Sequence, residues 1–533
     1  MRRIFIIFTA ILLVVVSCSK EDKQRLEQLM ESRDHLGQSA DGIQMPPAAE
    51  AVPVADMDFS FSFDKDLYFV DAAGSVTIEY TLGEDSDVEV TTKGGWTAVV
   101  APSGAKGTVT LTAPDPARTE EIVVTATSAS GRRTAAILPL LVRNPYSDAT
   151  RPMMEAMGYY SFKPWNANLE NYQKLADAGI TMVTVETDEA DYLDQMEMAR
   201  AVGIRVLAVI GWASGGWYNN MSDENLARLE QLIVSLKNRP ELFGYHICDE
   251  PSVDNIYELM AIEDKMTQLD PDHPVYVNLR PLGSAEGMGA STYDQYVEVF
   301  ASMMHLKQLS FDMYPALANG YMQSDWHYCL RTVSNAAKRY GKPFWAFAAS
   351  CWINKEAVLI NRAKPTVENV LLQVYTDLAY GAQAIQYFTI QDYSGTDFAP
   401  IMRDGTWTEA YDILKEANLQ MQRRAFIFKD GDVRHVRRIG AVATMDDILT
   451  PADLPEGIDD IVAPVSATVS FIENDGNEYI VIINDLLVVE QQIAIYLNKP
   501  AYCIDSDANF TLYEAGAYGF LIPKGGMLVF KYK

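Results

Sequence analysis

The sequence is poor in cysteine, in histidine and in positive charge. Its 533 residues include 5 cysteines and 6 histidines, and 43 Lys and Arg stand against 72 Asp and Glu, for a formal net charge of −29. A protein that binds nucleic acid needs Lys and Arg to displace the counterions of phosphates, so this balance argues against a nucleic-acid partner. The cysteines after Cys18 are widely scattered without a CxxC pair, which argues against a zinc site and a dense disulfide framework.

The N-terminus carries a short apolar run. Two arginines precede the stretch from Ile4 to Val16, and Ser17 and Cys18 follow it, which matches a secretory signal and is too short for a spanning helix. Residues 15–18, VVSC, resemble the lipobox of bacterial lipoproteins, which implies that Cys18 is acylated. The SKED that follows the run resembles the acidic tag of Bacteroidetes surface lipoproteins. The alternative is an ordinary signal peptide with an incidental cysteine.

These features predict an outer-membrane lipoprotein exposed at the cell surface. The predicted signal peptide covers residues 1–18, and a flexible tether covers residues 19–51, which lack sustained apolar periodicity. Over residues 52–145, short runs of alternating β-branched and polar residues are separated by Gly, Asp, Pro and Ser, as in a β-sandwich. We expect an immunoglobulin-like module there, which acts as a spacer or, alternatively, binds carbohydrate.

Residues 152–430 show a different period. Short apolar strands alternate eight times with longer stretches of helical period, which predicts a (β/α)8 TIM barrel. The rival, a doubly wound sheet, would show fewer units and a glycine-rich first turn, and no GxGxxG is present there. Strand patterns return over residues 431–533 and predict a C-terminal β-sandwich. The fold class is therefore multidomain, with a β-sandwich on either side of the barrel.

In such a barrel, chemistry takes place at the carboxyl ends of the strands. The residues expected there are aromatic, acidic and amide-bearing, and they include no His or Cys cluster suited to a transition metal. This mixture suits a sugar, since flat rings cover its C–H faces and carboxylates and amides bind its hydroxyls. We predict a glycan partner and no cofactor or metal. The candidate substrate-binding residues are Tyr159, Glu186, Trp212, Trp217, Asn278, Arg280, Tyr314, Trp352, Tyr387 and Gln391.

The adjacent acids Asp249 and Glu250 end the fourth predicted strand. Glycosidic bond cleavage needs a protonated carboxylic acid at the leaving oxygen and usually a second, ionised carboxylate. Two neighbouring acids in a partly dry cleft push their proton affinities apart, so that one is kept protonated near neutral pH. The alternative is that either acid simply neutralises the start of the helix expected near Ser252.

The stretch GYHICDEPS, residues 244–252, resembles the strand-four motif of glycoside hydrolase clan A, whose members have (β/α)8 barrels. LAYGAQAIQYFTIQDY, residues 378–393, resembles the last helix and strand of β-galactosidase-like barrels in that clan. The resemblance implies that Glu250 is the acid/base, with Asp249 where a neighbouring residue often hydrogen-bonds the sugar. It therefore implies a glycoside hydrolase that acts on an oligo- or polysaccharide.

One position departs from that clan. Its nucleophile is a glutamate at the end of strand seven, where this chain reads KPFWAFAASCW, residues 342–352, without an acid. Asp312 or Glu186 is a possible second carboxylate, and Asp312 is the third candidate catalytic residue. A substrate acetamido group oriented by Asp249 is another possibility, as for adjacent Asp-Glu pairs in some hexosaminidases. The last is a non-catalytic surface lipoprotein that binds glycan in the same cleft.

Overall fold

A computed structural model describes residues 59–65, 68–70, 73–92, 94–114, 122–138, 140–142, 154–210, 222–353, 361–393, 396–440 and 447–532. The predicted signal peptide with Cys18, the tether, and the candidate residues Trp212 and Trp217 lie outside these ranges.

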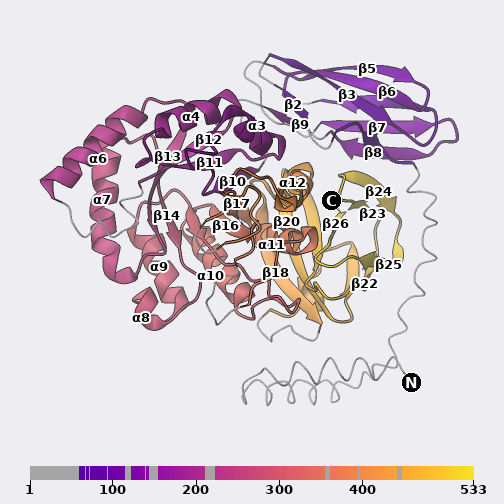
Figure 1. Cartoon of the computed structure of the whole chain (residues 1–533). Coiled ribbons are helices and arrows are strands. Elements are labelled where there is room, and N and C mark those ends of the chain that lie inside the picture. Colours follow the sequence, from indigo (N-terminus) through magenta and orange to yellow (C-terminus); the bar gives the residue numbers. More distant parts are fainter. Residues whose placement is uncertain are drawn as a thin grey trace, which may run out of the picture. The chain divides into compact units, whose positions relative to one another are not determined.

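Eight parallel strands close into a barrel in sequence order, so the predicted (β/α)8 barrel is confirmed (Figure 1). Most of their side chains are buried, because helices cover the outer face and side chains fill the inside. This double burial explains the near-continuous apolar runs in the sequence. The strands are β10 (Glu155–Tyr159), β11 (Met182–Glu186), β12 (Arg205–Val209), β13 (Leu242–Asp249), β14 (Val275–Leu279), β15 (Leu309–Phe311), β16 (Phe344–Ala349) and β17 (Ala382–Phe388).

Helices alternate with these strands, and many begin at a capping side chain. Asn168, Ser222, Thr292, Thr366 and Thr408 each accept a hydrogen bond from a backbone N–H in the first turn. None of the described helices combines the length and apolar character needed to span a bilayer. The helices are α3 (Leu169–Asp177), α4 (Tyr192–Ala201), α6 (Asp223–Leu236), η5 (Val253–Asn255), α7 (Ile256–Leu269), α8 (Ala285–Met288), α9 (Tyr293–Met303), α10 (Trp326–Arg339), α11 (Val367–Ala379), α12 (Glu409–Arg423) and α13 (Ala425–Phe428).

The strands before the barrel are mainly antiparallel and enclose a core of their own. One sheet has the order β1-β3-β6-β5, and β2 pairs with β9. The buried core includes Ile78, Tyr80, Trp96, Leu111 and Val124. An immunoglobulin-like topology stays a prediction. The strands are β1 (Ser62–Phe63), β2 (Tyr68–Val70), β3 (Ser75–Thr81), β4 (Ser86–Thr91), β5 (Thr97–Ser103), β6 (Lys106–Thr112), β7 (Val123–Ser128), β8 (Arg133–Ile137) and β9 (Leu140–Val142).

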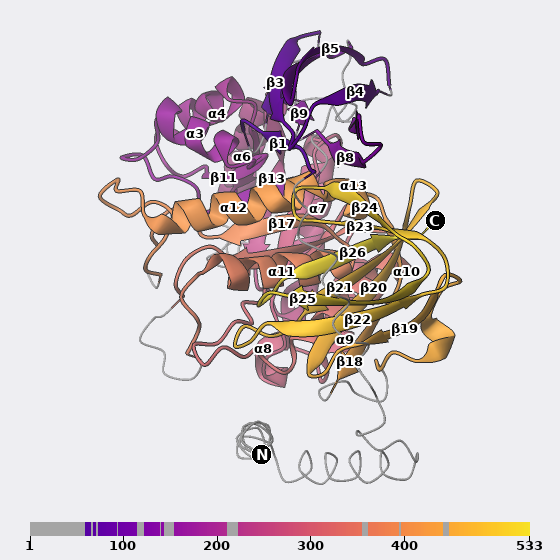
Figure 2. The same cartoon turned by 90° about the vertical axis from the view of Figure 1, so that its right-hand side faces the viewer.

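The strands after the barrel belong to two sheets (Figure 2). One has nine strands in the order β18-β20-β21-β26-β23-β24-β8-β7-β4, and the other has three in the order β19-β22-β25. The larger sheet therefore includes three strands that precede the barrel, through the pairing of β24 with β8. The strands are β18 (Asp432–Gly440), β19 (Ile458–Val462), β20 (Ser466–Asn474), β21 (Asn477–Asn484), β22 (Gln491–Leu497), β23 (Ala501–Ile504), β24 (Asn509–Tyr513), β25 (Gly516–Ile522) and β26 (Met527–Lys531), with the short helix η6 (Pro451–Asp453).

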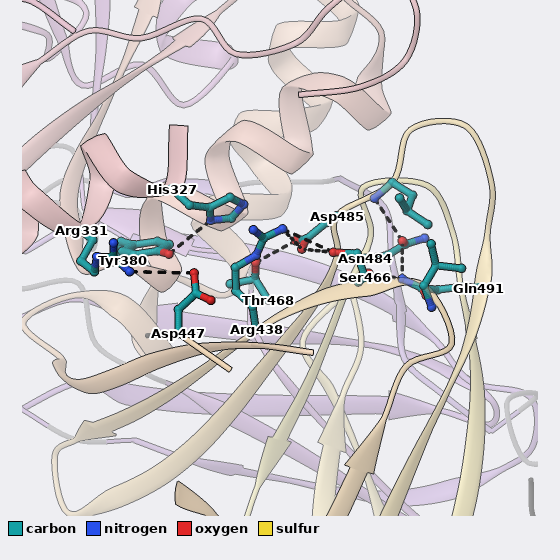
Figure 3. A network of polar contacts seen from close by, with 12 residues as sticks. His327, Arg331, Tyr380, Arg438, Asp447, Ser466, Thr468, Asn484, Asp485 and Gln491 are labelled. Carbon is teal, nitrogen blue, oxygen red and sulfur yellow. Dashed lines mark hydrogen bonds and ion pairs between the residues drawn. The ribbon is translucent and has the colours of Figure 1, made fainter. Parts of the chain in front are cut away.

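A polar network lies where the nine-stranded sheet meets the barrel helices (Figure 3). Arg438 of β18 donates from Nη2 to Asp485 Oδ2 at 3.2 Å, and Thr468 Oγ1 donates to the other carboxylate oxygen at 2.8 Å. On the helix side, His327 Nδ1 lies 3.2 Å from the Tyr380 hydroxyl, and burial lowers the pKa of His327 to about 3. The histidine is therefore neutral, and the network is a fixed structural joint between sheet and barrel.

Candidate functional site

Three carboxyl groups meet at the carboxyl ends of neighbouring barrel strands. Asp249 is the last residue of β13, Glu250 follows it, and Asp312 follows β15. Both segments are held by the strand between them: Glu250 N–H donates to the Asn278 carbonyl at 2.9 Å, and Asp312 N–H donates to the Leu279 carbonyl at 3.1 Å. These backbone bonds place the three acids together at the barrel mouth.

The backbone of Glu250 adopts a left-handed conformation, with φ of +48°. A side chain with a Cβ avoids this region, at a free-energy cost of about 1–2 kcal/mol. Proline follows at position 251 and the strand ends, so the chain turns sharply at Glu250. The carboxyl of Glu250 is thereby presented at the exposed mouth of the barrel instead of continuing the alternation of the strand.

Crowding changes the acid strength of two of these groups. Burial raises the pKa of Glu250 above its usual range, the negative charge of Asp249 adds to the rise, and Arg280 and hydrogen bonding with Asp312 oppose it. Burial also raises the pKa of Asp312 well above its usual range, and the charges of Glu250 and Asp249 contribute. Ionising both carboxyl groups would bring two like charges together, so the pair holds its protons more tightly than isolated carboxyl groups do.

Asp249 is oriented by a chain of hydrogen bonds through the barrel interior. Asn278 Nδ2 donates to Asp249 Oδ1 at 3.0 Å, and Ser310 Oγ donates to Asn278 Oδ1 at 2.9 Å. Gln386 Nε2 donates to Ser310 Oγ at 2.8 Å, and the Tyr276 hydroxyl donates to Gln386 Oε1 at 2.6 Å. Each group is buried except Asp249, so the layer beneath the carboxylate has little freedom to rotate.

Sequence reasoning missed Tyr276, Ser310 and Gln386. Their signal was the two-residue alternation of the strands: Tyr276 lies two positions before Asn278 on β14, and therefore on the same face. On β17, Gln386 points into the barrel, while Tyr387 points outward and donates to Asn418 Oδ1 of α12 at 3.2 Å. Tyr387 is fully buried there, so the structure does not bring this candidate residue to the mouth.

Arg280 lies beside the carboxyl groups at the end of β14. Its Nη1 donates to the Gly287 carbonyl at 2.5 Å, which fixes the guanidinium to α8. From this position its charge lowers the pKa of Glu250, but burial and Asp249 outweigh it. Tyr159 is buried below the mouth, with its hydroxyl 3.5 Å from His246 Nε2. Burial lowers the pKa of His246 to about 4, so this core histidine is neutral.

A hollow of about 300 Å³, open to solvent, lies at the ends of β10, β11 and β17. We call it the Lys163 hollow. Tyr160 and the exposed Tyr393 stack at 4.6 Å between ring centroids and form one wall. Lys163 forms ion pairs with Glu186 and Glu189, so Glu186 is already neutralised. Gln391 also lines this hollow and accepts a hydrogen bond from Lys163 N–H at 3.1 Å. The wall combines an aromatic face with polar groups.

A second hollow, of about 240 Å³, lies beyond the ends of β15 and β16. We call it the Arg362 hollow, after the guanidinium that lies 5.7 Å above the ring of Tyr314. Trp352 lies beside it and donates from Nε1 to the Arg362 carbonyl at 3.2 Å. Glu250 is not among the described lining of either hollow. The carboxyl groups instead occupy the open mouth, with Asp312 and Tyr314 on one loop.

The described residues contain no group of three or more His, Cys, Asp or Glu side chains arranged to hold a metal ion.

Comparison with protein-family models and with curated proteins finds no match. Among solved structures, the chain is similar to a family 5 glycoside hydrolase from Bacteroides vulgatus, with 13% identity, 76% of this chain and 92% of that chain covered, and a TM-score of 0.47. It is similar to a family 42 β-galactosidase from G. stearothermophilus, with 10% identity, 71% and 98% covered, and a TM-score of 0.46.

It is also similar to a β-galactosidase from a psychrophilic Marinomonas, with 11% identity, 50% of this chain covered and a TM-score of 0.39; the match spans 60% of that chain. These structural neighbours are glycoside hydrolases. What this barrel does depends on the residues at its own mouth.

The raised pKa of Asp312 makes a testable statement about stability. As the pH rises from 4, the unfolded chain releases this proton before the folded protein does, so the free energy of unfolding falls. Asp312→Asn removes this fall in the free energy of unfolding, because asparagine does not ionise. We expect the variant to match wild type at pH 4 and to be more stable by at least about 1 kcal/mol at pH 8, measured by urea unfolding.

The matched control is Asp264→Asn, which neutralises an exposed aspartate on α7. It should leave the difference from wild type below about 0.5 kcal/mol at both pH values. The contrary result is that Asp312→Asn destabilises the protein, and does so more at pH 8 than at pH 4. It would show that Asp312 is ionised and favourably paired.

Proposed function

We propose that this protein is a glycoside hydrolase in which Glu250 donates a proton to the leaving oxygen of a glycan. The observation that carries the proposal is the crowding of Glu250 with Asp249 and Asp312 at the barrel mouth, where burial and like charge raise the pKa of Glu250. A carboxylic acid kept protonated near neutral pH is what protonation of a glycosidic oxygen requires.

Glu250 and Asp312 have different parts in this proposal. Glu250 is the exposed member of the pair and can reach a substrate, whereas Asp312 Oδ1 is buried and has no hydrogen-bond partner among the described residues. An attacking carboxylate must reach the sugar from the side opposite the acid. Because its Oδ1 is buried, Asp312 is not placed to make that attack on a sugar at the mouth. Asp312 is therefore assigned no step in the proposed chemistry.

The group that attacks the anomeric carbon must come from elsewhere. Glu186 is neutralised by Lys163, and residues 344–353, with strand seven and its described end, contain no acid. Asp249 is held by Asn278 beside the acid. We propose that the acetamido oxygen of a 2-acetamido sugar attacks, that Asp249 accepts a hydrogen bond from the acetamido N–H, and that water then opens the ring so formed and restores the acetamide. Glu250 receives the proton of that water, which balances the cycle.

The second candidate function is glycan binding without cleavage. It is favoured by the same strand-seven end, where Ser350 and Cys351 are buried and donate to backbone carbonyls. The stacked Tyr160 and Tyr393 in the Lys163 hollow would serve either function, because an aromatic face binds the C–H surface of a sugar whether or not the bond is cut.

Glu250→Gln separates the two functions. On a panel of aryl glycosides that includes 2-acetamido sugars, we expect the variant to lose about 10²–10⁴-fold in kcat/KM on a substrate with a poor leaving group such as methoxyphenol. With a dinitrophenyl leaving group the loss should be much smaller, because that group departs without protonation.

Glu230→Gln, an exposed change on α6, is the matched control and should retain full activity. Equal losses on both leaving groups would contradict a proton-donor role for Glu250. Binding of glycans with no turnover by either protein would favour the second candidate function.

We also propose that the protein is held at the cell surface by a lipid on Cys18. The support is the arginine pair, the apolar run and the VVSC sequence of residues 15–18. A single lipid chain gives marginal membrane binding, so several acyl chains on one cysteine would be needed for stable anchoring.

Cys18→Ser tests the anchor. Expressed in a bacterial host with its own leader, the wild-type protein should sediment with the membrane fraction, and most of the variant should be found in the soluble fraction. Ser17→Ala keeps a small residue before the cysteine and should behave as wild type. Membrane association that survives Cys18→Ser would overturn the lipid anchor.

A further inference from the structure

Arg362 is an unusual cation in a protein with so many acids. Its Nη1 donates to the neutral amide Gln323 Oε1 at 2.8 Å, and its guanidinium lies above the ring of Tyr314. Among the described residues it forms no ion pair with a carboxylate. Burial lowers the pKa of Arg362, while the charges of Tyr314, Asp312 and Asp325 oppose that shift. A partly buried guanidinium outside an ion pair loses water and gains less counter-charge than a paired one.

Arg362 is also the only charged residue that lines the described part of its hollow. Cys351 lies there as a neutral thiol, because burial raises its pKa to about 12. Gln373 is occupied on both sides: its Oε1 accepts from Ala349 N–H at 3.1 Å, and its Nε2 donates to the Asn369 carbonyl at 2.9 Å. The charged group that this hollow offers to a ligand is therefore the Arg362 guanidinium.

The Arg362 hollow adjoins the carboxyl groups of the candidate active site. Tyr314 belongs to its lining and lies two residues after Asp312 on the same loop. The Arg362 guanidinium lies 5.7 Å from the centroid of the Tyr314 ring, which links the hollow to the loop that carries Asp312. A sugar whose substituent enters this hollow would therefore lie next to the bond that Glu250 protonates.

We propose that the Arg362 hollow binds an anionic substituent, a carboxylate or a sulfate, on the glycan. The inference rests on the proposed function and adds the charge class of the substrate to it. A guanidinium offers two parallel N–H donors, which match two oxygens of either group. The ligand would supply the ion-pair partner that the described part of the chain does not, and the hollow, which is open to solvent, would receive the substituent at its rim.

The simpler role for Arg362 is to brace two loops. Its backbone carbonyl accepts from Trp352 Nε1, and its side chain reaches Gln323 on the loop after β15. A brace predicts that loss of the side chain lowers stability and weakens all ligands alike. An anion subsite predicts a loss confined to charged ligands, and this difference separates the two roles.

The test measures calorimetric binding to the Glu250→Gln protein, in which cleavage of the ligands is slowed. Two matched pairs differ mainly in charge: a hyaluronan tetrasaccharide against chitotetraose, and trigalacturonic acid against galactotriose. A keratan sulfate oligosaccharide, which has sulfate and no carboxylate, distinguishes the two anions. We expect at least one anionic ligand to bind about 10-fold or more tightly than its neutral partner.

Arg362→Gln should weaken that anionic ligand by about 10- to 100-fold and leave the neutral ligand within about 2-fold. Arg362→Lys, which keeps the charge without the planar fork, should give an intermediate loss. The matched control Arg339→Gln removes a surface arginine that pairs with Glu298 on α9, and it should change neither affinity. Thermal unfolding of each variant measures the bracing role separately.

Three outcomes would overturn the inference. They are neutral ligands that bind as tightly as anionic ones, an Arg362→Gln variant that weakens both members of a pair equally, and a protein that binds none of the five. Turnover of neutral aryl glycosides would leave the proposed function standing in the first two cases, whereas absence of both turnover and binding would overturn that function as well.

Discussion

The proposed chemistry of this protein depends on one constraint, the crowding of three carboxyl groups at the mouth of the barrel. Asp249 and Glu250 are adjacent in sequence, and Asp312 comes from the strand two positions further along the barrel. Burial raises the pKa of Glu250 and of Asp312, and the negative charge of Asp249 adds to both shifts. Such a destabilising arrangement is typical of functional sites. It persists only where the surrounding structure holds the groups in place.

That core is the layer of buried polar groups under Asp249. Asn278, Ser310 and Gln386 come from three different strands and are joined to one another by hydrogen bonds. The carboxylate above them is therefore fixed while Glu250, on its left-handed turn, remains exposed. One acid is held still and the other is accessible, which is the division of labour that orienting a substrate and donating a proton require.

Much of the fold could be predicted from the sequence. The eight barrel strands follow from apolar runs buried on both faces, and the helix starts at Ser222, Thr292, Thr366 and Thr408 follow from capping residues. The pairing of β24 with β8 could not be predicted, because edge strands carry no sequence signal for a distant partner.

The site was less predictable than the strands that carry it. Strand ends identify Asp249, Glu250 and Asp312 by position alone, but whether a neighbour such as Tyr387 points inward depends on the phase of each strand. Lys163 follows β10, and Glu186 is the last residue of β11. Their ion pair depends on the closeness of these two strand ends, which the fold shows and the sequence does not. Arg362 escaped notice for a similar reason, since it follows a stretch with no strand pattern.

The most direct test of the central claim is a titration of the Glu250 carboxyl itself. Carbon-13 NMR of side-chain carboxyl groups, with Glu250→Gln to assign the resonance, reports its protonation between pH 3 and pH 9. We predict that the Glu250 carboxyl ionises above the usual glutamate range, and that its pKa falls when Asp249 is changed to Asn, because the charge of Asp249 contributes to the rise. A Glu250 carboxyl that ionises at or below the usual glutamate pKa would contradict the account.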